Sequence, residues 1–157
     1  MAEDTHFKYK KIVHNLIDES FPSLNKKNVF IIRVPMLEKY YAGVFWLFPG
    51  VMFIFVNSKL GLLKKSSLKG MFAHELCHLE KSREMGWFKH FGYYVSCGTS
   101  KDICAENEKA TDKKTIRKGY GKDLYSLHQE KPFDETLKDF YLSPKEIMKY
   151  SKKIGKW

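Results

Sequence analysis

Three residues in one short segment have the types and the spacing that metal chemistry requires. His74 and His78 lie four positions apart and Glu75 follows the first histidine, so the segment reads His-Glu-Leu-Cys-His. On an α-helix, residues at i and i+4 project from the same face, where one zinc ion can bind both imidazoles. Glu75 lies one position round the helix, close enough to touch a metal-bound water without being a ligand. The pattern predicts a metal site with Glu75 as the general base.

The residues around this motif favour the helix that such a site needs. Apolar residues recur at helical spacing and predict a buried stripe of Leu68, Phe72, Leu76 and Leu79. Ser66 or Ser67 can cap the start of the helix, and Gly86 suits its end. Gly70 is the one discordant residue, because glycine weakens a helix interior.

A catalytic zinc ion usually has three protein ligands, so the two histidines require a third residue. A third histidine six positions after the second is excluded, because Glu84 stands there and Lys81 replaces the glycine of that pattern. Glu108 and Asp112 share one face of a helix predicted from about Asp102 to Lys118. Glu108 can bind the metal while Asp112 accepts the spare N–H of a ligating histidine and fixes its tautomer.

Other residues remain open as the third ligand, namely Glu106, His90 and Cys104. Glu106 lies about 200° from Glu108 around the helix, so both cannot face the metal. Taken alone, Glu108 and Asp112 would be read as an ordinary solvated helix face. The HExxH segment upstream makes metal ligation the better interpretation, because its zinc lacks a ligand.

At these residues the chain resembles the gluzincins, zinc metallopeptidases in which HExxH is followed on a later helix by Glu-x-x-x-Asp. It is most similar to the compact soluble group called minigluzincins, over roughly residues 29–119. The resemblance implies a zinc metalloendopeptidase. His74, His78 and Glu108 would be the ligands, Glu75 the catalytic base and Asp112 the residue that orients a histidine.

In that group a terminal segment can occupy the cleft and hold the enzyme latent as a zymogen. By this resemblance, residues 142–157 are a candidate regulatory tail. The segment from Lys81 to Lys101 departs from the family pattern and leaves substrate preference open. Its aromatic part, Trp87–Val95, is expected to pack in the core or cover the sheet, with a cleft wall or a membrane contact as alternatives.

The whole chain, residues 1–157, is predicted to be one α+β domain with a zincin-like arrangement. A small, mostly antiparallel sheet of three to four strands would pack on the motif helix and the glutamate helix. The predicted strands are residues 28–34, 42–48 and 51–57, and the predicted additional helices are about residues 6–19, 133–141 and a last one capped by Ser143-Pro144-Lys145-Glu146. Residues 120–131 are polar and are predicted to be a loop.

Residues 40–58 carry no charge and are long enough to be considered as a membrane span. Pro49-Gly50 interrupts them, and β-branched and aromatic residues dominate both halves, which favours two strands joined by a turn. The strand Val51–Asn57 is expected to be an exposed edge that pairs with an extended substrate. A membrane-associated protease is the alternative interpretation.

The net charge of +10 is compatible with anionic partners, but no nucleic-acid-binding motif accompanies the scattered lysines, and a peptide or protein substrate is the expected partner. Cys77, Cys97 and Cys104 form no CxxC pair and no signal peptide is visible, which predicts a cytoplasmic protein. A basic binding module with a structural zinc whose fourth ligand is a cysteine is a further alternative.

Peptide hydrolysis at this site also needs a hydrogen-bond donor for the oxyanion that forms on the attacked carbonyl. Three downstream residues are candidates, namely His128, Tyr120 and Tyr125. Their order in the sequence does not rank them, and each is also an ordinary core or surface residue by type.

Overall fold

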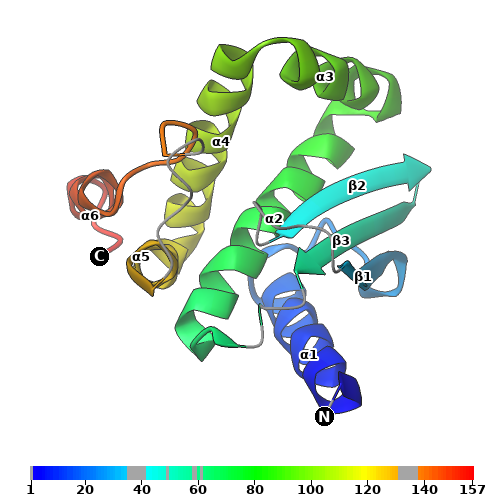
Figure 1. Cartoon of the computed structure of the whole chain (residues 1–157), viewed down its shortest axis with the longest axis horizontal. Coiled ribbons are helices and arrows are strands. Elements are labelled where there is room, and N and C mark those ends of the chain that lie inside the picture. The colour runs from blue at the N-terminus through cyan, green and yellow to red at the C-terminus, as the bar shows by residue number, and fades with distance from the viewer. Residues whose placement is uncertain (1, 35–41, 49, 58–59, 61, 131–137) are drawn as a thin grey trace.

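The computed structural model describes residues 2–34, 42–48, 50–57, 60, 62–130 and 138–157, and within them the chain is α+β and mostly helical (Figure 1). The elements are α1 (Ala2–Ser20), the 3-10 turn η1 (Lys26–Asn28), β1 (Val29–Val34), β2 (Ala42–Phe48), β3 (Val51–Asn57), α2 (Lys65–Met85), α3 (Trp87–Thr99), α4 (Lys101–Thr115), the π-turn η3 (Ile116–Tyr120), α5 (Gly121–Glu130) and α6 (Pro144–Lys153). No helix in the described ranges is long and apolar enough to cross a membrane.

The three strands form one mixed sheet in the order β1-β3-β2. β2 and β3 pair antiparallel, with Phe45 opposite Phe53, which confirms the predicted hairpin in the uncharged stretch. β1 pairs with β3 in parallel, with Val29 opposite Met52. The sheet is therefore mixed, and the prediction of a mostly antiparallel sheet is corrected.

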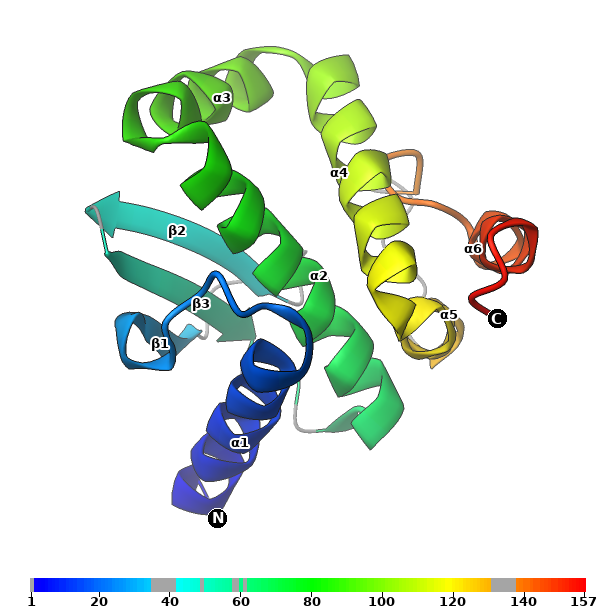
Figure 2. The same cartoon turned by 180° about the vertical axis from the view of Figure 1, so that it is seen from behind.

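The position of β3 overturns one prediction about substrate binding. β3 is hydrogen-bonded on both sides, so its backbone groups have no free edge to offer a peptide. The expectation that Val51–Asn57 is the exposed edge is wrong. β2 lies at an edge of the sheet instead, and it runs alongside α2 (Figure 2).

Helix α2 is the centre of the molecule. The sheet and α1 contact it on one side, and α4 and α5 contact it on the other (Figures 1 and 2). The whole predicted apolar stripe is fully buried, namely Leu68, Phe72, Leu76 and Leu79. Each such side chain contributes roughly 1.5–3 kcal/mol by its burial, so the helix that carries the motif is firmly held.

Gly70 is explained by the crossing of α2 and α5. A Cβ atom at Gly70 would overlap the backbone of Asp123 and Leu124, so glycine lets the two helices approach closely. The prediction of a loop at residues 120–131 is therefore corrected: α5 occupies most of that segment. Leu124 and Leu127 are buried, and packing on α2 outweighs the weak helical preference of this polar sequence.

The helix ends agree with the sequence in part. Gly86 ends α2 with φ of 80°, and Ser143 and Glu146 form the predicted capping box of α6. Neither Ser66 nor Ser67 caps α2, whose N-cap position is Lys64. The helix predicted to start at about Asp102 begins at Lys101, and Ser100 caps it by accepting a hydrogen bond from the backbone of Ile103. Most of the predicted helix at residues 133–141 lies outside the described residues.

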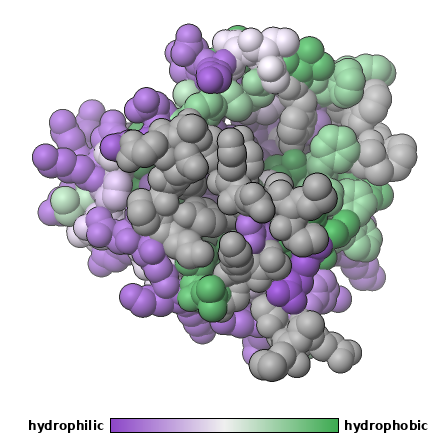
Figure 3. Space-filling model, in the orientation of Figure 1, coloured by the Kyte–Doolittle hydropathy of each residue, from purple (hydrophilic) through white to green (hydrophobic). Residues whose placement is uncertain are grey.

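Apolar and charged residues occupy different sides of the surface. Hydrophobic side chains gather on the side of α3 and the sheet, while hydrophilic side chains dominate the side of α6 (Figure 3). On α3, Phe88, Phe91 and Val95 are exposed, whereas His90 is buried against the ring of Trp46. The aromatic segment thus divides between the surface and the cover over the sheet.

Glu80 joins three segments through ionic contacts. It is 7% exposed and lies 2.9 Å from Nζ of Lys114 and 3.1 Å from Nζ of Lys118, and it accepts a hydrogen bond from Ser23 at 3.2 Å. Burial opposes ionisation of Glu80, but the hydrogen bonds from the two lysines outweigh it and lower its pKa below 4.5. The contacts tie α2 to α4, to η3 and to the segment after α1.

The free energy of unfolding of the Glu80→Gln protein is expected to be about 2 kcal/mol lower than that of wild type at pH 7, because both lysines lose their ionic partner. A carboxyl whose pKa is lower in the folded chain stabilises it above the unfolded pKa, and that contribution is lost as the pH falls through the folded pKa. The difference in unfolding free energy between wild type and the variant should therefore be smaller at acidic pH. Urea unfolding at pH 7 and at about pH 3 measures it. Glu84→Gln is the control, since Glu84 is 62% exposed and contacts Lys114 at 3.5 Å.

Candidate metal centre

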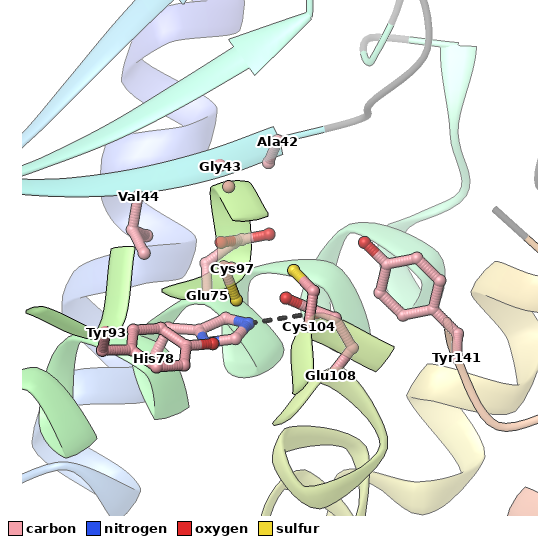
Figure 4. A pocket seen from close by; sticks show the side chains of 11 residues that line it. Ala42, Gly43, Val44, Glu75, His78, Tyr93, Cys97, Cys104, Glu108 and Tyr141 are labelled. Atoms are coloured by element: carbon pink, nitrogen blue, oxygen red, sulfur yellow. Dashed lines mark hydrogen bonds and ion pairs between the residues drawn. The ribbon is translucent and has the colours of Figure 1, made fainter. Parts of the chain in front are cut away.

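Two helices bring three potential metal ligands together. His74 and His78 project from successive turns of α2, and Glu108 projects from α4 toward them. Oε2 of Glu108 lies 3.0 Å from Nε2 of His74 and 3.2 Å from Nε2 of His78, and the two Nε2 atoms are 3.0 Å apart. Figure 4 shows His78 and Glu108 facing each other across one pocket.

The spacing of these atoms fits a single ion. Ligands at about 2.0–2.1 Å from a tetrahedral zinc ion lie about 3.3 Å from one another. The three observed separations, 3.0, 3.0 and 3.2 Å, are close to that value. The His74, His78 and Glu108 group could therefore hold a metal ion.

Asp112 sets the orientation and the tautomer of His74. Its Oδ1 lies 2.9 Å from Nδ1 of His74, and its Oδ2 accepts a hydrogen bond from the backbone N–H of Leu142 at 2.8 Å. Asp112 is fully buried, so this carboxylate depends on both partners. Because Nδ1 donates its proton to Asp112, neutral His74 presents the lone pair of Nε2 to His78 and Glu108. Nε2 of His78 lies 3.0 Å from this lone pair, so one cation or one proton can be shared between the two nitrogens.

The ionisation of the group matches this geometry. Burial raises the pKa of Glu108, but the positive charge of His78 and the hydrogen bond from His74 outweigh it and hold that pKa far below the usual range. Burial lowers the pKa of His74, but the hydrogen bonds to Asp112 and Glu108 outweigh it and raise the pKa well above 6.5. Without a metal the group thus attracts a proton, and a metal ion must replace that proton to bind.

Glu75 faces the same pocket without joining the three ligands. The pocket has a volume of about 410 Å³ and is lined by residues from β2, α2, α3, α4 and the segment before α6, namely Ala42, Gly43, Val44, Glu75, His78, Tyr93, Cys97, Gly98, Cys104, Glu108 and Tyr141. Burial raises the pKa of Glu75 above 4.5. A carboxylate with a raised pKa is better suited to take up and return a proton near neutral pH.

Tyr141 is a pocket residue that the sequence did not single out. Its ring centroid lies 5.9 Å from that of His74 and 6.2 Å from that of His128 (Figure 4). Tyr141 lies 29 residues after Asp112 and 63 residues after His78, so no spacing rule connects it to either motif. Among the three predicted oxyanion donors, His128 packs near this ring, and burial lowers its pKa to about 4, which keeps it neutral.

The other two predicted donors lie elsewhere. The hydroxyl of Tyr120 shares a hydrogen bond with Ser20 at 2.7 Å, and Tyr125 packs edge-on against Trp157. Neither belongs to the described residues that line the pocket. Neither tyrosine is therefore placed to contact a substrate in this pocket.

The reserve ligands do not join the metal-binding group among the described residues. Glu106 is exposed, His90 is buried against Trp46, and Cys104 lines the pocket wall. Cys77 is buried and accepts a hydrogen bond from the hydroxyl of Thr115 at 3.4 Å. Among the described residues, no cysteine belongs to the His74, His78 and Glu108 group. A structural zinc site would need a fourth protein ligand of that kind.

The C-terminal tail does not fill the pocket. α6 packs on α5 and η3, and Ile147 and Ser151 are buried there. None of residues 142–157, all of which are described, lines the pocket. The start of this segment contacts the site from outside the pocket, through the backbone N–H of Leu142 and the carboxylate of Asp112. A regulatory role for residues 142–157 stays a prediction.

Together these residues form a His-His-Glu group, a carboxylate that orients one histidine, and a separate buried carboxylate that faces the same pocket. Such a set can bind a divalent ion and move a proton beside it. Comparisons with protein-family models, with curated proteins and with solved structures gave no match. The functional argument therefore starts from these side chains.

The Asp112→Asn protein is expected to bind Zn²⁺ about 10- to 100-fold more weakly, because an amide cannot hold the Nδ1 proton of His74 as a carboxylate does. Competition with a chromophoric chelator measures the affinity. Asp102→Asn is the matched control, because Asp102 lies exposed on the same helix. Equal affinities of the two variants would show that Asp112 does not support the ligand.

Proposed function

We propose that the protein is a zinc metallopeptidase of the gluzincin class with a zincin-like catalytic domain. The observation that carries the proposal is the convergence of His74, His78 and Glu108 on one point beside Glu75. Two imidazole nitrogens and one carboxylate oxygen, with a position left for water, are a typical ligand set of catalytic zinc. The HExxH motif supplies His74, Glu75 and His78, and the Glu-x-x-x-Asp motif supplies Glu108 and Asp112. These are the two motifs that suggested this class from the sequence.

Each residue has a defined task in the proposed reaction. A bound zinc ion would polarise the scissile carbonyl and make a water acidic. His74, His78 and Glu108 hold the ion, and Asp112 keeps Nε2 of His74 unprotonated. Glu75 is placed to accept the proton of the attacking water and to pass it to the leaving amine.

The edge of β2 suits an extended peptide. Ala42, Gly43 and Val44 line the pocket, and β2 is an outer strand of the sheet that the described residues form. An extended chain can be added alongside the outer strand of a sheet. A Cβ built on Gly43 meets no atom within 4 Å, so space is open beside the strand. Tyr141, across the pocket, is a candidate donor to the oxyanion.

Digestion of a peptide library by the zinc-loaded protein tests the proposal. We expect cleavage that stops on addition of 1,10-phenanthroline and returns when Zn²⁺ is restored. Cleavage that survives removal of the metal would exclude this mechanism. A chain that binds one zinc ion and cleaves no peptide would leave the metal site in place and remove the peptidase activity.

A further inference from the structure

Two cysteines lie in the wall of the same pocket. Cys104 precedes Glu108 by one turn of α4, and Cys97 lies near the end of α3, on the other side of the corner at Ser100. Figure 4 shows both side chains at the pocket, and both are partly exposed. Cys77 is fully buried on α2. Two of the three thiols therefore share one accessible wall, and the third is protected.

The two cysteines contact each other and Tyr93. Cys97 shares hydrogen bonds with the hydroxyl of Tyr93 and with the thiol of Cys104. All three side chains line the same pocket, so a reagent that reacts with one thiol there meets the other beside it.

The same contacts make a direct bond between the sulfurs accessible. Sulfur atoms that share a hydrogen bond need to move only about 1–2 Å to reach the disulfide length of about 2.0 Å. The two residues are joined by a short corner, and the pocket admits a small reagent to both.

We propose that Cys97 and Cys104 are a redox-active thiol pair, which a small disulfide such as glutathione disulfide converts into an intramolecular disulfide. One of the two cysteines attacks the reagent as its thiolate, forms a mixed disulfide and releases one glutathione thiolate. The other cysteine then loses its proton, attacks the sulfur of the first and releases the second glutathione. The protein loses two electrons and two protons, and the reagent becomes two glutathione thiols.

The disulfide would change the pocket beside Glu108. It would tie the end of α3 to the start of α4, the helix that carries Glu108 and Asp112. It would also replace two polarisable thiol groups in the wall with one S–S bond. The thiol chemistry does not rest on the proposed hydrolysis and is measured without any substrate.

Counting thiols after exposure to glutathione disulfide tests the inference. The reduced chain has three cysteines, and after oxidation, denaturation and alkylation we expect one alkylated cysteine, Cys77. Trypsin cleaves after Lys101, between the pair, so the disulfide should join peptide 90–101 to peptide 102–109. Dithiothreitol should restore all three thiols.

The single variants Cys97→Ser and Cys104→Ser are the controls. Each should lose the cross-link, and the remaining pocket cysteine of each should hold glutathione as a mixed disulfide. The inference is overturned if wild-type protein keeps three alkylated thiols, stops at a mixed disulfide, or cross-links through Cys77 or between two chains.

Discussion

The Glu75→Gln protein is expected to bind one zinc ion per chain and to hydrolyse peptides about 10²- to 10⁴-fold more slowly than wild type. Glutamine has nearly the shape of glutamate but cannot accept the proton of the attacking water. The ligands His74, His78 and Glu108 are untouched, so the metal should stay. Metal analysis and initial rates on one fluorogenic peptide measure both effects.

The matched control for this variant is Glu106→Gln. Glu106 is exposed on α4, two residues from a ligand, and has no role in the proposed reaction. It should retain both the metal and the activity. A Glu75→Gln protein with undiminished turnover would remove Glu75 from the mechanism, whatever its zinc content.

The second large effect is expected from the histidines. His74→Ala and His78→Ala should each lose the zinc ion on dialysis, with affinity reduced by more than the roughly 100-fold that loss of an orienting residue causes. Zinc content after dialysis and chelator competition measure the loss. His14→Ala, on α1, is the control and should keep the metal, because His14 is no part of the group.

The two histidine variants should differ in stability. Removing His74 leaves the buried carboxylate of Asp112 with the backbone of Leu142 and without its imidazole partner, which should cost about 1–3 kcal/mol. His78 contacts Glu108, whose side chain is 16% exposed and keeps His74 as a partner, so removal of His78 should cost less. Urea unfolding of the metal-free proteins separates the two, and equal losses would contradict the role given to Asp112.

The metal ligands could be predicted because their geometry is local. His74 and His78 belong to one helix, and so do Glu108 and Asp112, so a spacing of four residues places each pair on one face. The demand of zinc for a third ligand then links the two helices. The structure brings these four side chains together, although they come from segments about 30 residues apart.

The pocket around the ligands could not be predicted, because tertiary contacts create it. Tyr141 reaches His74 only because the chain returns beside α4 after α5. The edge of β2 faces the pocket because β1 pairs with β3, and no sequence pattern distinguishes that order from a simple meander. Strand identity is visible in the sequence, while strand order is a property of the whole fold.

Helix α5 shows the same limit on prediction. Most of its residues are polar, and glycines stand at positions 119 and 121 around its start, so local preferences indicate a loop. Its helix is held by Leu124 and Leu127 against α2, at the place that Gly70 leaves open. The discordant glycine was a visible signal of close helix packing, but it did not identify the partner.

Zinc content of the Glu108→Ala protein is the most direct test of the central claim that a carboxylate from α4 completes the site begun by two histidines of α2. Wild-type protein and the Glu106→Ala control should each hold one zinc ion per chain after dialysis, and Glu108→Ala should hold almost none. If Glu108→Ala kept zinc with the wild-type affinity, the two helices would not share a metal ion and the proposed site would be wrong.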